Sequence, residues 1–202
     1  RHGWQVDQRL KFGEFSAGTA RRGWTKGSDY PFIVRFAGAR EKLRFPVLDG
    51  GGNQAMAHCI GKLREQDLRA FREYFDVNLN TTDTFACSIR VSDTATYDFH
   101  AANLNVQQNP GYRPMEGTIR GGAETVALQA VWHLASGQRA LGTEPLGIEF
   151  RRGGEVIGAV ETVNEGRVWL RDDLAPESRL ALAAVAAALL LRSGLADHND
   201  PE

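Results

Sequence analysis

The sequence predicts a mainly β (α+β) fold, in which an antiparallel barrel or strongly curled sheet encloses an apolar C-terminal helix. Two observations predict the sheet: short segments with alternating β-branched and aromatic residues, and glycine-rich turns between them. The third observation is the run 180–191, LALAAVAAALLL, which is apolar on every side of a helix. Such a helix must be surrounded by protein or lipid.

Seven segments have the composition and alternation of strands, namely 30–36, 42–48, 85–91, 125–131, 147–151, 155–163 and 167–170. Turn residues between them, at 49–53, 152–155 and 164–166, predict hairpins, because tight turns need the positive φ that Gly and Asn adopt easily. Hairpins make neighbouring strands antiparallel. A meander without interleaved helices argues against a doubly wound parallel sheet.

Two segments have helical patterns. Leu68, Phe71 and Phe75 recur at helical spacing in 66–76, which predicts one short amphipathic helix. The second helix, 176–192, opens with Pro176 and an acidic first turn and stops before a Ser-Gly pair. We expect it inside the barrel, and the alternative is a position between a sheet and a dimer partner.

Composition limits the class of protein. With 202 residues, 42% apolar and 24% charged, the chain is expected to form a single β-rich domain over 1–202. A net charge of −1 gives no sign of a sequence-specific nucleic-acid partner. The apolar run of 12 residues is about 18 Å long as a helix, against about 30 Å of bilayer hydrocarbon, so it does not predict a membrane span.

The two cysteines, Cys59 and Cys87, have no metal-binding spacing. Both lie in apolar, strand-like segments, so we expect two buried free thiols in a cytoplasmic protein, with a single bridge between them as the alternative. The first ten residues contain no apolar stretch typical of a signal peptide. The alternative is that a targeting segment preceded residue 1 and was removed.

Three stretches carry a family resemblance: LDGGGNQA at 48–55, IGKL at 60–63, and VWLRDDL at 168–174 ahead of the apolar helix. With the length near 200 residues, they resemble the tubby-like family, which includes the LURP-one-related proteins and the phospholipid scramblases. The resemblance implies an antiparallel barrel threaded by a hydrophobic helix. The chain lacks the cysteine-rich stretch and the acidic calcium-binding segment of scramblases, so the resemblance does not extend to scrambling.

Motifs for catalysis are missing from the sequence. Residues 50–55 satisfy G-x-G-x-x-A, but a hairpin turn explains their glycines, and the strand–helix–strand context of a dinucleotide site is absent. No serine-hydrolase or zinc-protease motif occurs either. We therefore predict no catalytic residue, no cofactor and no metal, and the chain reads as a non-enzymatic protein.

The polar segment 93–109 is the densest group of hydrogen-bonding side chains. Combined with His58 or His133, it suggests an alternative function, a small-ligand-binding protein or hydrolase-type enzyme. The same composition is also typical of an irregular loop without function, because Asn and Asp are turn-forming residues. The residues of this alternative polar site are Asp98, His100, Asn103 and Asn105.

Charge is concentrated near the start of the chain, where residues 1–44 hold ten Lys/Arg against four Asp/Glu, interleaved with aromatic residues. This mixture predicts binding of an anionic lipid or membrane surface by the N-terminal strands, and a solvated outer sheet face is the alternative. A homo-oligomer with the C-terminal helix as its interface is the third functional hypothesis. The predicted ligand-binding residues are Arg21, Arg22, Trp24, Lys26, Arg40 and Lys42.

Overall fold

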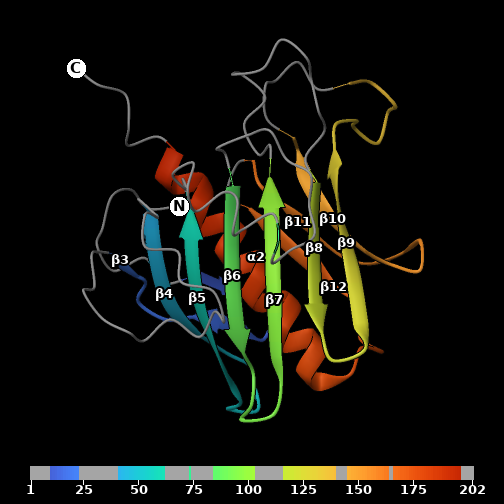
Figure 1. Ribbon diagram of the computed structural model, residues 1–202. Coiled ribbons are helices and arrows are strands. Elements are labelled where there is room, and N and C mark those ends of the chain that lie inside the picture. The colour runs from blue at the N-terminus through green and yellow to red at the C-terminus, as the bar shows by residue number, and fades with distance from the viewer. Residues whose placement is uncertain are drawn as a thin grey trace, which may run out of the picture.

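The structure is a computed structural model of the chain (Figure 1), and it describes residues 10–22, 41–61, 73, 84–102, 116–139, 145–163 and 166–196. These residues form twelve strands and the helix α2 (Pro176–Ala196). The strands are β1 (Leu10–Phe12), β2 (Phe15–Ala17), β3 (Arg21–Arg22), β4 (Glu41–Leu48), β5 (Gln54–Gly61), β6 (Thr84–Arg90), β7 (Thr96–Ala102), β8 (Glu116–Gly121), β9 (Glu124–Val131), β10 (Gly147–Arg152), β11 (Glu155–Glu161) and β12 (Arg167–Leu170).

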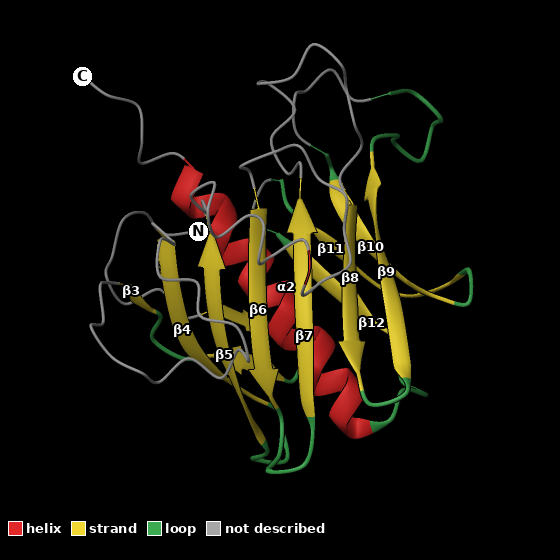
Figure 2. Ribbon diagram, in the orientation of Figure 1, coloured by secondary structure: helices red, strands yellow, loops and turns green. Residues whose placement is uncertain are grey.

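All strands belong to one antiparallel sheet. Eleven of them follow each other along a single path in the order β1-β2-β4-β5-β6-β7-β8-β9-β10-β11-β12, and β3 pairs with β4 beside this path. The sheet curls until it is nearly closed into a barrel around α2, as Figure 2 shows. The predicted mainly β barrel is therefore confirmed.

Tight turns connect the strands as the glycine pattern predicts. In the β4–β5 turn the Asp49 carboxylate accepts hydrogen bonds from Gly51 N (2.9 Å) and Asn53 N (2.8 Å). These bonds, and above all the one from the Asn53 side chain, lower the pKa of Asp49. The β10–β11 turn has two glycines with positive φ, Gly153 at 59° and Gly154 at 89°, which other residues adopt only at a cost.

The helix α2 is enclosed by the sheet. Figure 1 shows it running between the wall of β5 to β8 and the strands β11 and β12. Every residue from Leu180 to Leu189 is buried, and Ala183, Ala184 and Ala187 are 0% exposed. Small alanine side chains keep the helix thin, which lets strands approach it from several sides.

The helix is four residues longer than predicted, because it continues through Gly194 to Ala196. A glycine inside a helix costs only about 1 kcal/mol relative to alanine, so it is a weak stop signal. The polar segment 93–109 also differs from the loop alternative, since its residues Thr96–Ala102 form β7, which pairs with β6 and β8. Pairing on both sides overrides the turn preference of Asp98.

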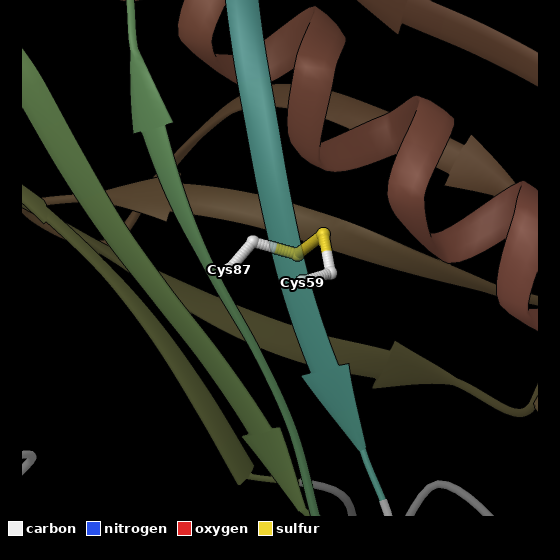
Figure 3. The surroundings of a disulfide bond; sticks show 2 residues. All are labelled: Cys59 and Cys87. Carbon is white, nitrogen blue, oxygen red and sulfur yellow. A yellow bond between two sulfur atoms is a disulfide. The ribbon is translucent and has the colours of Figure 1, made fainter. Parts of the chain in front are cut away.

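The two cysteines are joined by a disulfide (Figure 3). The expectation of two free thiols is wrong. Cys59 of β5 and Cys87 of β6 are direct partners in the antiparallel register, with Cα atoms 4.0 Å apart. Both side chains are 0% exposed and belong to the core. The register of β5 and β6 places two cysteines opposite each other although they are 28 positions apart in the sequence. The spacing of the cysteines does not reveal this register.

Two predicted elements lie outside the described residues: the strand at 30–36 and, apart from Glu73, the amphipathic helix at 66–76. Glu73 itself is helical and exposed. In the described part of the chain, no helix is both long enough and apolar enough to cross a membrane.

Candidate functional site

The outer face of β4 to β8 carries several of the residues that the sequence singles out. Core side chains alternate along each strand, so that Cys87 and Ile89 of β6 face the core and Ser88 faces outward. The register places Ser88 beside His58 of β5 and Asp98 of β7. The same row continues to Arg44 of β4 and Arg120 of β8. We call these five residues the polar row.

Four cations lie on this outer face: Lys42 and Arg44 of β4, Arg90 of β6, and Arg120 of β8. The three arginines are exposed and Lys42 is half-buried. The register also places Arg21 of β3 opposite Arg44. We call the four cations, which come from three strands, the basic face.

The basic face differs from the opposite wall in how its arginines are paired. No ion pair links Arg44, Arg90 or Arg120 to a carboxylate within the described residues. Each arginine of β10 and β12, and the one that follows β12, has an acidic partner. The pairs are Arg151–Glu149 at 2.9 Å, Arg152–Glu124 at 3.0 Å, Arg167–Glu161 at 3.9 Å and Arg171–Glu155 at 3.2 Å.

The centre of the outer face is buried, although it lies outside the barrel. His100, which follows Asp98 by two residues on β7, is only 2% exposed. Burial disfavours its charged form and Arg120 repels it, which together lower the pKa of His100 from 6.5 to about 4. The Ser88 and Thr84 side chains are fully buried on the same face, and neither hydroxyl has a hydrogen-bond partner in the part of the chain that the structure describes.

A second polar cluster lies where α2 enters the barrel. Ser178 Oγ donates to Glu124 Oε2 (3.0 Å), and Arg152 Nη1 donates to Glu124 Oε1 (3.0 Å). Tyr97 Oη lies 3.3 Å from Ser178 Oγ. These contacts attach the first turn of the helix to β7, β9 and β10. The neighbouring cavity has a volume of about 10 Å³, which is close to the minimum for one water molecule and too small for a substrate.

The predicted residues fall into three groups. Lys42 lies on the basic face, and Asp98 and His100 lie together on the outer side of β7, separated from His58 of β5 by the strand β6. Arg21 and Arg22 form β3. Trp24, Lys26, Arg40, Asn103 and Asn105 lie outside the described residues. His133 is exposed in an isolated bridge with Arg139 and is not part of the polar row.

Sequence reasoning did not single out Arg90 and Arg120, which stand in later strands. Nothing in their local sequence marks them, because the register of five strands is what brings them to the face of Arg44. Among the described residues, no group of three or more His, Cys, Asp or Glu side chains is arranged to hold a metal ion.

The chain matches no protein-family model, and no curated protein or solved structure matches it. The resemblance to the tubby-like family therefore stays a prediction.

Proposed function

We propose that this protein is a non-enzymatic binding module that binds an anionic lipid or membrane surface through its basic face. The observation that carries the proposal is the contrast between the two walls. Among the described residues, Arg44, Arg90 and Arg120 have no carboxylate partner, whereas the arginines of β10 and β12 have one each. A cation that is not already paired gains more from an external phosphate than one that must first leave a carboxylate.

The arrangement of the basic face suits an extended anionic surface better than a small ligand. Arg44 and Arg120 are separated by four strand spacings, or about 19 Å at about 4.8 Å each. A single phosphate cannot contact both side chains, but a plane of headgroups can. Among the described side chains of β4 to β8, Asp98 is the one carboxylate on this face, so the local charge is positive.

The test is binding to vesicles of phosphatidylcholine with about one third phosphatidylserine. Each basic residue close to such a surface contributes about 1 kcal/mol. Arg44→Glu removes one such contribution and adds repulsion, so we expect about a tenfold loss of binding. Binding should also weaken steeply as salt is raised, because salt screens exposed charges.

Arg167→Glu is the matched control, because it makes the same charge change at a 76% exposed position on β12. We expect this variant to bind like the wild type. Equal losses in both variants, or binding that does not respond to salt, would rule out the basic face as the lipid site.

The alternative functions stay predictions with less support. An enzyme or small-ligand receptor at the polar segment needs converging groups around a cavity, and the described cavity at the helix entrance is too small. The enclosed helix gives no reason for an oligomer, because its own sheet covers it. A cytoplasmic location also stays a prediction, and the cysteines no longer support it, since they form a disulfide.

A further inference from the structure

The barrel has a seam. Among the described residues, the strands at the two ends of the sheet path, β1 and β12, do not pair with each other. The helix α2 lies across this gap, since it contacts β2 on one side and β11 and β12 on the other. The seam is therefore closed by the helix and by side chains, and backbone pairing between strands contributes nothing there within the described residues.

The β1–β2 hairpin on one side of the seam is held by few backbone contacts. Within the described residues, its backbone joins β4 through the pairs Ser16↔Leu48 and Ala17↔Val47 and through one hydrogen bond from Gly18 N to Pro46 O (2.9 Å). By contrast, β5 pairs with β4 along its whole length. After the hairpin, the chain pairs with β4 again through β3. The C-terminal end of the hairpin is therefore attached to the sheet by a separate element.

One side chain of α2 connects the two sides of the seam. Arg179 Nη1 lies 2.6 Å from Glu14 Oε1, in the turn between β1 and β2. Arg179 Nη2 lies 3.0 Å from Asp172 Oδ1, just after β12. The same guanidinium stands over the Phe15 ring, 5.5 Å from its centroid. The planar fork of arginine makes this double attachment possible.

We propose that the β1–β2 hairpin is a detachable strap over the seam and that Arg179 is its latch. Ion pairs that are partly exposed contribute little each, and few backbone hydrogen bonds must break, so the main cost of opening is the exposure of Phe15 and Ala17. This cost is local, so the hairpin opens without unfolding the other strands. Opening uncovers Phe15, Ala17 and the flank of α2 that β2 contacts. The seam is then the place where the enclosed helix becomes accessible while the rest of the barrel stays intact.

Hydrogen exchange of the full chain, with its disulfide intact, tests the proposal peptide by peptide. We expect the amides of β1 and β2 to exchange faster than those at the centres of β5 to β9. Glu14→Gln removes the hairpin's ion pair without changing its shape, and should speed exchange in 10–17 by about threefold, within the range for an exposed ion pair. Arg179→Ala also removes the contact with Phe15, and should speed it by about tenfold.

Asp172→Asn is the matched control. It removes the other arm of the latch but leaves the bond between Arg179 and Glu14, so exchange in 10–17 should change less than twofold by this reasoning. The proposal is overturned if the hairpin is as protected as β6 and β7 in the wild type. It is also overturned if Glu14→Gln speeds exchange equally throughout the sheet, because that result means global destabilisation.

Discussion

His100 shows how one side chain can couple this fold to pH. The folded protein keeps the imidazole buried, 2% exposed, and its pKa is lowered to about 4, while an unfolded chain has the ordinary value of 6.5. Between these two values the unfolded state binds a proton that the folded state does not. Lowering the pH through this window therefore favours unfolding.

We predict that the free energy of unfolding falls by up to about 3 kcal/mol between pH 7 and pH 4, because each unit of pKa difference is worth about 1.4 kcal/mol. Urea unfolding at several pH values measures this slope. His100→Gln removes the titrating group and should flatten the slope, whereas His133→Gln, at an exposed position, should leave it unchanged. A slope that is the same in all three proteins would mean that another group titrates.

The residues of the candidate site could be foreseen only in part. Lys42, Asp98 and His100 follow from local composition, because basic and polar residues cluster in their segments. Arg90 and Arg120 do not, because each is a single arginine in a strand whose neighbours become known only when strands are paired. Burial of His100 on the outer face was also beyond the sequence, since alternation alone assigns that position to solvent.

At the scale of elements, α2 is the best predicted part of the molecule. A helix with no polar side must be surrounded by protein or lipid. The apolar run 180–191 is too short to span a bilayer, so the sequence already required that protein surrounds it. The hairpins followed from turn chemistry in the same way. The strands β5, β7 and β8 were harder, because their pairing on both sides stabilises residues with little strand preference of their own.

Charge in the enclosed helix should be strongly destabilising. Ala187→Asp and Ala184→Asp each place a carboxylate at a position that is 0% exposed and surrounded by apolar side chains. We predict a loss of at least about 4 kcal/mol, enough to unfold most domains of this size. Thermal unfolding followed by circular dichroism measures the loss.

Ala127→Asp serves as the control for this substitution, because Ala127 is exposed on the outer side of β9. It should fold normally. Soluble, native-like Ala187→Asp protein would mean that α2 is not enclosed as the structure places it.

At the scale of the whole molecule, the disulfide joins neighbouring strands across a sequence separation of 28 residues. Its removal frees this loop in the unfolded chain, and the chain-entropy estimate for a loop of this length is about 3 to 4 kcal/mol. Disulfides of this kind persist mainly where the surroundings are oxidising, so the bond also bears on where the protein folds.

We predict that the double variant Cys59→Ala, Cys87→Ala loses about 3 to 4 kcal/mol of unfolding free energy in urea titrations. In native buffer the disulfide of the wild type should resist reduction, because both cysteines are 0% exposed. Once the disulfide is reduced under unfolding conditions, the wild type should have the same unfolding free energy as the variant. A double variant as stable as the oxidised wild type would show that the bond contributes nothing to stability.

By itself, the sequence determined the class of the fold. Strand alternation, hairpin turns and a thin apolar helix are local patterns, and each restricts what the chain can bury and where it can turn. These patterns predicted an antiparallel, curled sheet around 176–192, as the structure has it.

Only the tertiary structure decided which residues meet. Strand register joined Cys59 to Cys87, gathered the basic face from three strands, and left a seam where Arg179 reaches Glu14 and Asp172. Register depends on the summed packing of whole strands against α2 and against each other, so no short stretch of sequence contains it. For this reason the sequence predicted the barrel, while the disulfide, the basic face and the contacts of Arg179 became known only from the folded chain.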